Sequence, residues 1–163
     1  MNEDYIFEYL HMEMVEKFCS DPDTSSSLDE KDQVNLAIQK LERLGFTVGQ
    51  RYIEKSTKDI PRFKDELETM KFVCKDVWLM IYRKQIDNLR TNHHGVYNLH
   101  DYRFRLLEQM SNSNQYKEQA PKYLAFPCGF LRGALSGLGY DCLVTAEITK
   151  MPACKFLIQI LHS

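Results

Sequence analysis

The stretch that decides the fold of this chain is RFKDELETMKFVCKDVWLMIYRKQIDNLRTN, residues 62–92. Its apolar residues return every three or four positions, which is the spacing of one buried helix face. The members of this stripe are Phe63, Leu67, Met70, Cys74, Val77 and Ile81. The period changes near residue 85, so the stretch predicts a helix over about 61–84 that leads directly into a strand.

Short β-rich runs follow this helix. They span residues 85–91, 95–100 and 104–108. Because two tight turns join them and Gly95 can supply a positive φ, we expect an antiparallel meander of three strands. Further on, the segments 142–149 and 154–161 flank Met151-Pro152 and predict a final hairpin.

Helices are predicted before and after these strands. The first spans residues 3–18 and carries more apolar surface than docking on its own core requires, so core packing and a subunit contact both remain open. The second begins near Asp32, and Gly45 and Gly49 interrupt it four residues apart. They indicate a close backbone approach, a kink or a break near Gly45.

The last predicted helix runs from Pro121, in its first turn, to about residue 138. Pro127 predicts a kink or a late start. Gly129, Gly133 and Gly137 form a ridge that we expect to pack on the sheet. Together the elements predict an α+β fold with four or five helices on one face of a small antiparallel sheet. One domain would span residues 1–163, with a mobile loop at 20–31.

Charge is unevenly distributed along the chain. Residues 1–32 hold ten acidic and two basic side chains, although the net charge of the whole chain is only −2. A dedicated nucleic-acid binder usually carries a larger basic excess, so this class is disfavoured. The start, Asn2-Glu3-Asp4, does not suit a signal peptide, and no apolar run approaches the length of a bilayer span.

Catalytic, cofactor and metal sites are not expected from the residues. His93-His94 is expected in an exposed turn, and Cys74 lies on an apolar helix face, where a thiol is usually inert. Cys128, Cys142 and Cys154 lack the close-spaced pairs of a zinc site. An enzyme that uses Cys74 or the histidines remains an alternative that requires a polar cleft.

A basic set surrounds the junction between the second and third predicted helices. Its members are Arg51, Lys55, Lys58, Arg62 and Lys64. A solvated helix face explains such a set, and attraction to an anionic membrane surface is the other interpretation.

Several long segments carry a resemblance to a known family. They are LERLGFTVGQRYIEKSTKD (41–59), RFKDELETMKFVCKDVW (62–78), KQIDNLRTNHHGVYNLHD (84–101), FRLLEQM (104–110), KYLAFPCGFLRGALSGLG (122–139) and VTAEITKMPACKFLIQI (144–160). In these segments the chain resembles subunit 6 of the transport protein particle (TRAPP), a vesicle-tethering complex. The resemblance covers nearly the whole chain and implies an α+β fold related to TRAPP subunit 3 and to 4-vinyl-reductase-like domains.

The resemblance also implies a function. It implies a non-enzymatic adaptor without a cofactor, which forms a heterodimer with TRAPP subunit 3 through its first two helices. The assembled complex acts as a Rab guanine-nucleotide exchange factor in endoplasmic reticulum to Golgi transport, so the chain would be cytoplasmic and peripheral at these membranes. An isolated chain could instead form a homodimer. The implied interface residues are Ile6, Phe7, Leu10, Met14, Phe18, Leu41, Leu44 and Val48.

One departure from subunit 3 concerns lipid. Subunit 3 is acylated on a cysteine just before its third helix, whereas residues 56–64 of this chain contain no cysteine and have Ile60-Pro61 there. A covalently filled acyl tunnel is therefore not expected. A small-ligand-binding sensor of related fold is the alternative function.

Overall fold

The computed structural model describes residues 6–19, 29–108 and 116–162, and the side chains of residues 116–119 lie outside the description. The helical elements are α1 (Ile6–Cys19), α2 (Glu30–Ser56), α3 (Glu66–Phe72), the π-helical turn η2 (Val73–Val77), α4 (Trp78–Tyr82), α5 (Arg105–Glu108) and α6 (Tyr116–Gly137). The strands are β1 (Asn88–Thr91), β2 (Val96–Asp101), β3 (Cys142–Lys150) and β4 (Ala153–Ile160). Of the predicted mobile loop, residues 20–28 lie outside the described residues, while Glu30 and Lys31 already belong to α2.

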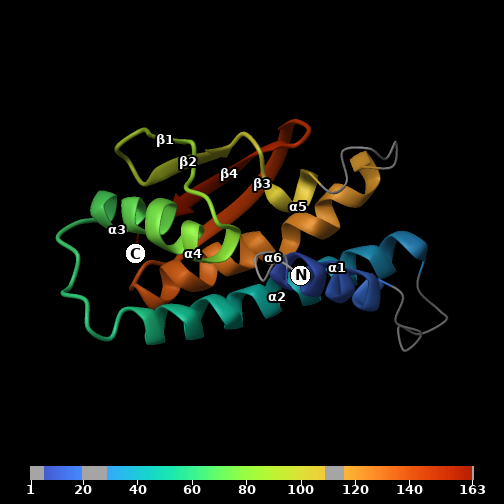
Figure 1. The fold of residues 1–163 in the computed structure, drawn as a ribbon, viewed down its shortest axis with the longest axis horizontal. Coiled ribbons are helices and arrows are strands. Elements are labelled where there is room, and N and C mark those ends of the chain that lie inside the picture. Colours follow the sequence, from blue (N-terminus) through green and yellow to red (C-terminus); the bar gives the residue numbers. More distant parts are fainter. Residues whose placement is uncertain (1–5, 20–28, 109–115, 163) are drawn as a thin grey trace.

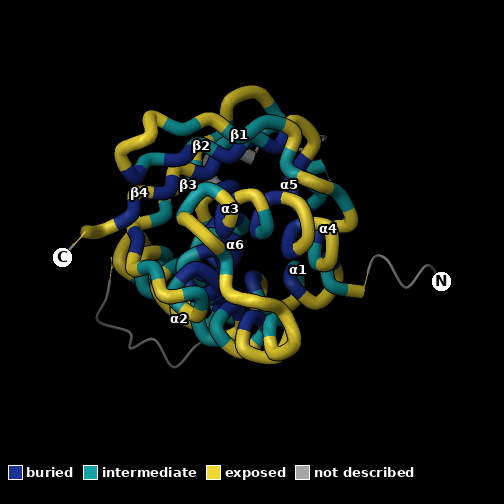
Figure 2. Tube along the Cα trace, turned by 90° about the vertical axis from the view of Figure 1, so that its left-hand side faces the viewer, coloured by how far each residue is buried: buried dark blue, intermediate teal, exposed yellow. Residues whose placement is uncertain are grey.

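The four strands form an antiparallel sheet in the order β1-β2-β4-β3. The final hairpin was predicted correctly, and its inward-facing residues on β4 are buried in the main core. The α3–α4 segment and α6 cover this inward face, and α2 lies beyond α6 as an outer layer (Figure 1). Buried stretches accordingly gather between the sheet and the helices (Figure 2). The α+β class, with helices on one face of the sheet, is therefore confirmed.

The prediction that residues 104–108 form the third strand of the meander is wrong. These residues form the short helix α5, and the place beside β2 belongs to β4. Phe104 is fully buried, with ring centroids 5.0 Å from Tyr82 and 5.7 Å from Trp78. Leu106 and Leu107 are both buried, which the alternating faces of a strand would not allow against a single core. The aromatic cluster around Phe104 thus overrides the local strand pattern.

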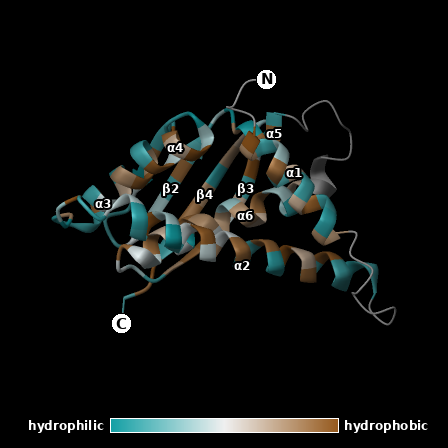
Figure 3. Cartoon of the chain, turned by 60° about the horizontal axis from the view of Figure 1, so that its bottom comes forward, coloured by the Kyte–Doolittle hydropathy of each residue, from teal (hydrophilic) through white to brown (hydrophobic). Residues whose placement is uncertain are grey.

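The long helix α2 is continuous, so the alternative of a break near Gly45 does not apply. Hydrophobic segments recur along it between hydrophilic ones, as expected of an amphipathic helix (Figure 3). α2 and α6 run side by side, and their glycines interlock (Figure 1). A Cβ on Gly45 would clash with the backbone of Phe126, and one on Gly133 with the backbone of Phe46. The close approach inferred from Gly45 and Gly49 is confirmed.

The same contacts correct two predictions about α6. The ridge of Gly129, Gly133 and Gly137 faces α2 and not the sheet. α6 also begins at Tyr116, before Pro121, and continues through Pro127. The helix is kept through both prolines, although each of them removes one helical N–H donor.

The helix of the opening stretch starts later than predicted, at Glu66. Asp65 caps it, because its side chain accepts a hydrogen bond of 2.8 Å from the Glu68 N–H. Glu68 in turn accepts a hydrogen bond of 2.6 Å from the N–H of Lys64, the residue before the cap, which also ties the start of the helix to the preceding chain. Arg83 ends the helix with a φ of 59°, in the left-handed region. Between these ends the predicted stripe is confirmed, with Met70, Cys74 and Val77 buried.

Candidate interaction surface on α1 and α2

The first turns of helix α1 bury polar side chains and expose apolar ones, whereas Val15 in its second half is buried in the core. Glu8 and His11 are 3% and 0% exposed, whereas Ile6 and Leu10 on the other side are 60% and 56% exposed. Burying an apolar side chain of this size stabilises a protein by roughly 1.5–3 kcal/mol. A helix that hides polar residues and exposes apolar ones is therefore typical of a surface that a partner covers.

The buried polar side of α1 is held by an ion pair and by rings. Arg105 donates to Oε1 of Glu8 at 3.4 Å, which ties α1 to α5. The His11 ring lies 5.9 Å from Tyr123 and 5.7 Å from Phe126, centroid to centroid. Both His11 ring nitrogens lack a hydrogen-bond partner among the described residues. Burial lowers the pKa of His11 to about 4, because the apolar surroundings disfavour the charged imidazolium.

The predicted interface residues divide into three groups. Ile6, Leu10 and Val48 are exposed. Phe7, Met14, Phe18 and Leu44 are partly buried against the chain's own clusters. Leu41 is fully buried together with Val15 and Ala125, so it does not belong to an accessible surface. The i, i+4 spacing that suggested Leu41 places it on the same α2 face as Gly45 and Gly49, which is the face that meets α6.

Sequence reasoning missed the structural roles of Glu8 and His11. Tyr9, which is 56% exposed, belongs to the same surface and was not among the predicted interface residues. The available signal was that apolar residues occupy more than one face of the short α1. We call the exposed residues Ile6, Tyr9, Leu10 and Val48 the α1–α2 surface.

The predicted basic set is exposed. Arg51, Lys55, Lys58, Arg62 and Lys64 occupy the last turns of α2 and the connection to α3. None of the five forms an ion pair with another residue that the structure describes. They lie toward the end of α2 that is far from α1 (Figure 1).

The residues considered for catalysis do not converge. Cys74 is buried, and burial raises the pKa of its thiol to about 12. His93 and His94 are exposed in the β1–β2 turn, as predicted. Within residues 6–19, 29–108 and 116–162, no group of three or more histidine, cysteine or carboxylate side chains could hold a metal ion. The polar cleft that the enzyme alternative requires is therefore not found around Cys74.

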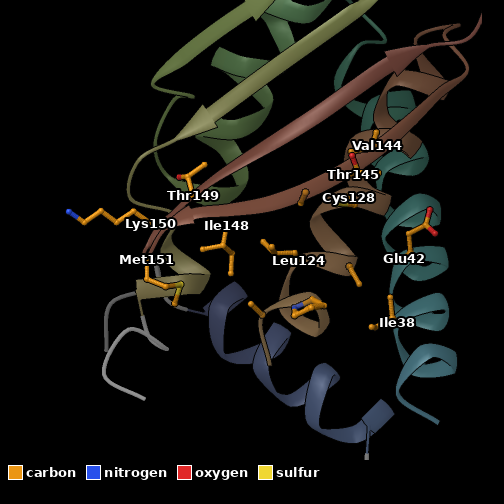
Figure 4. Close-up of a pocket in the computed structure, with 14 residues that line it drawn as sticks. Ile38, Glu42, Leu124, Cys128, Val144, Thr145, Ile148, Thr149, Lys150 and Met151 are labelled. Carbon is orange, nitrogen blue, oxygen red and sulfur yellow. The ribbon is translucent and has the colours of Figure 1, made fainter. Parts of the chain in front are cut away.

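A pocket of about 750 Å³ lies between β3, α6 and α2 (Figure 4). Its lining is largely apolar, with Leu124 and Cys128 from α6, Ile148 from β3 and Ile38 from α2. Lys150 and Glu42 stand at its margins. None of the described helices is long and apolar enough to cross a membrane.

The chain matches a known protein family along nearly its whole length. The family model described as "Transport protein particle (TRAPP) component" matches residues 7–161. The chain is 53% identical to human trafficking protein particle complex subunit 6B over 161 residues, which are 98% of each chain. The chain belongs to the TRAPP subunit 6 family. This TRAPP chain is also 44% identical to human subunit 6A, again over 98% of each chain.

A solved structure agrees with the fold of this TRAPP chain. It is subunit 3 of the trafficking protein particle complex from Naegleria fowleri, covalently bound to palmitic acid. The TM-score is 0.70 at 17% identity, and the alignment covers 96% of this chain and 95% of that chain. At this identity the likeness concerns the fold alone. Family membership makes the chain a component of the TRAPP complex, with other TRAPP subunits as its partners and a role in vesicle transport.

Proposed function

We propose that this chain is a non-enzymatic adaptor of the TRAPP complex that forms a heterodimer with TRAPP subunit 3. Its α1–α2 surface is the contact, and the assembled complex acts in endoplasmic reticulum to Golgi transport as a Rab exchange factor. The observation that carries the proposal is the inverted polarity of the first turns of α1, which expose Ile6 and Leu10 while they bury Glu8 and His11.

Two further observations support a protein contact at this place. Val48 is 38% exposed on α2, one turn after Leu44, so α2 also carries an exposed apolar side chain. Burial of Phe7 against Tyr82 and Phe126 holds α1 in place, with centroid distances of 5.8 Å to each ring. A surface built on anchored helices can meet a partner with little loss of conformational entropy on binding.

The test is co-purification with subunit 3. The double variant Ile6→Asp, Leu10→Asp places two charges on the α1–α2 surface without touching the core. We expect it to lose the 1:1 complex in size-exclusion chromatography with light scattering, while the unmodified chain keeps it. Chromatography without subunit 3 shows whether the isolated chain forms a homodimer.

The control is the double variant Leu79→Asp, Met80→Asp on α4. These side chains are 45% and 59% exposed, so the change in charge and surface polarity is comparable but lies elsewhere. The control is expected to bind subunit 3 like the unmodified chain. Unchanged binding by the α1 variant would refute the proposed contact.

The basic set supplies the second part of the proposal. Arg51, Lys55, Lys58, Arg62 and Lys64 attract anionic membrane surfaces while the chain stays peripheral through the complex. Each basic residue near an anionic leaflet contributes about 1 kcal/mol, so binding to phosphatidylserine vesicles is expected to weaken steeply with salt. Replacing Arg51, Lys55 and Lys58 with glutamine should remove this binding and leave the complex with subunit 3 intact.

The pocket of about 750 Å³ favours a second candidate, a small-ligand-binding sensor. Pockets of this size and apolar character accept drug-sized molecules. Native mass spectrometry of the purified chain distinguishes the candidates, because a stoichiometric bound molecule would support the sensor.

A further inference from the structure

Strand β3 forms an open edge of the sheet. It pairs with β4 on one side, and no described strand pairs with its other side. The N–H of Leu161 donates to the carbonyl of Asp141 at 2.8 Å, which sets the alternation of hydrogen bonds between the two strands. Every second residue of an antiparallel strand bonds to its neighbour, so the backbone groups that bond to β4 are those of Leu143, Thr145 and Glu147. The backbone groups of Val144, Ala146 and Ile148 therefore point to the open edge.

Below this edge the helical layer leaves space. The side chains of Val144, Ala146 and Ile148 turn toward the helices but remain only partly buried, whereas Phe156 and Ile158 on β4 are 0% exposed. The space is the pocket of about 750 Å³, which runs along β3 with α6 as its floor and α2 as its far wall (Figure 4).

The backbone and the groove together specify an occupant. A strand that pairs with Val144, Ala146 and Ile148 places its own paired residues on the same face of the sheet. Their side chains would enter the groove toward Leu124, Cys128 and the α2 wall. The intervening side chains would point to the outer face, which is exposed at Thr145 and Glu147.

Charge sets which end of the occupant is acidic. Lys150 extends from one end of the groove and Glu42 stands on the opposite side, on α2 (Figure 4). Glu42 is paired with Arg132 at 2.8 Å, whereas Lys150 has no ion pair among the described residues. An acidic residue at the Lys150 end is therefore the complementary arrangement.

We propose that the open edge of β3 and its groove bind an extended peptide segment of a partner protein by strand addition. The segment carries apolar residues at alternate positions and an acidic residue beside Lys150. At about 3.3 Å per residue, the stretch from Val144 to Lys150 accommodates roughly seven residues. A second copy of this chain fits less well, because its own helices would arrive on the face where α2 already stands.

The experiment uses the full chain and a set of dye-labelled eight-residue peptides. They have the pattern Glu-Thr-Φ-Thr-Φ-Thr-Φ-Lys or its reverse, where all Φ are valine, leucine or phenylalanine. We expect saturable binding by fluorescence anisotropy for at least one of them. Amide exchange at Val144, Ala146 and Ile148 should be fast in the free chain and slow at least tenfold when the peptide binds.

Matched peptides test the strand-addition geometry. In the antiparallel pairing of the Glu-first peptide, N-methylation of the Φ residues removes the donors that face β3 and should abolish binding, whereas N-methylation of the threonines should leave it unchanged. In the parallel pairing of the reversed peptide the two effects are exchanged, because the threonine N–H groups then face β3. Equal effects of the two methylation patterns, or no saturable binding across the set, would overturn the proposal.

Matched variants of the chain test the place. Ala146→Trp fills the groove and should weaken binding at least tenfold, while Thr145→Trp, on the outer face of the same strand, should not. Lys150→Glu should weaken binding of the acidic peptide and spare a peptide with glutamine in place of glutamate. Thermal melts confirm that each variant is folded.

The same purified chain and its variants also test for other occupants of the groove. A stoichiometric small molecule in native mass spectrometry, displaced by Ala146→Trp, would assign the groove to a small ligand. Concentration-dependent dimers lost in Ala146→Trp would assign it to a second copy. Either result replaces the peptide proposal. Loss of subunit 3 binding in the α1 variant is independent of both, because β3 is untouched there.

Discussion

The indole N–H of Trp78 donates a hydrogen bond of 3.0 Å to Oδ2 of Asp101, a carboxylate that is completely buried. The other oxygen of Asp101 accepts from Lys84 Nζ at 2.6 Å and from the Arg103 N–H at 3.1 Å. Trp78 begins α4 and Asp101 ends β2, so this network fastens the helix of the opening stretch to the sheet. Burying a carboxylate is costly unless hydrogen-bond donors and a positive charge compensate for the lost water, and here Trp78, Lys84 and Arg103 do so.

Replacing Trp78 with phenylalanine should test this network. The variant keeps an aromatic ring but removes one donor from the buried carboxylate, so we expect the free energy of unfolding to fall by about 1–3 kcal/mol. Urea unfolding followed by far-UV circular dichroism measures the change, since the chain then lacks tryptophan fluorescence. Tyr102→Phe, at a residue that is 53% exposed, should stay close to the unmodified chain. A similar loss in both variants would contradict the assigned role.

The interlocked glycines predict a reversal of the usual sign of glycine-to-alanine changes. In a helix interior, alanine is normally more favourable than glycine by about 1 kcal/mol. Here Gly45→Ala and Gly133→Ala should each destabilise by about 1–3 kcal/mol, because the added Cβ meets the backbone of the opposite helix. Gly137→Ala meets the Ile53 side chain at 3.1 Å and should cost less. Thermal melts rank the three, and stabilised Gly45 or Gly133 variants would refute the close crossing.

His11 should make stability depend on pH. Burial lowers the pKa of His11 from 6.5 to about 4. Between these two pH values, His11 is therefore mostly protonated in the unfolded chain and mostly neutral in the folded chain. Its stabilising effect is complete above pH 6.5 and is lost as the pH falls toward 4, by about 3 kcal/mol in total. Urea unfolding between pH 4 and pH 7.5 measures the slope. His11→Leu should flatten it, while His94→Leu, in an exposed turn, should not.

The cysteines should react slowly in the folded chain. Burial raises the pKa of Cys74 and Cys128 to about 12 and that of Cys142 to about 11, so the thiolate that attacks disulfide reagents is scarce at pH 8. Cys19 is only partly buried at the end of α1 and should react first. Mass spectrometry after timed labelling with a disulfide reagent gives the order. Modification of Cys74 as rapid as that of Cys19 would contradict the packing of α3 and α4.

Local periodicity predicted the elements whose neighbours agree with it. The stripe through Met70, Cys74 and Val77 is buried, and β3 and β4 alternate as expected. The strand prediction for residues 104–108 was wrong because it rests on a local pattern. Phe104 packs instead against aromatic rings from distant segments. The glycine ridge on α6 was recognised, but spacing alone cannot say whether a helix or a sheet approaches it.

The apolar pattern of α1 and α2 predicted only part of the candidate surface. An excess of apolar residues on α1 indicated a contact, and Ile6 and Leu10 are indeed exposed. Sequence could not assign Leu41 to the core, because both core and interface positions on α2 are apolar at helical spacing. It also could not show that Glu8 and His11 take the inward side, since their partners Arg105 and Tyr123 lie about a hundred residues away in the chain.

The sequence by itself determined the helix of the opening stretch, the closing hairpin, the α+β class and the resemblance to the TRAPP subunit 6 family. These follow from patterns within one segment or from the order of residues along it. Only the tertiary structure decided which faces meet: α6 against α2 through glycines, β4 in place of a third meander strand, and β3 left as an open edge above a groove. The reason is physical, because the burial of a side chain depends on what the rest of the chain brings to it.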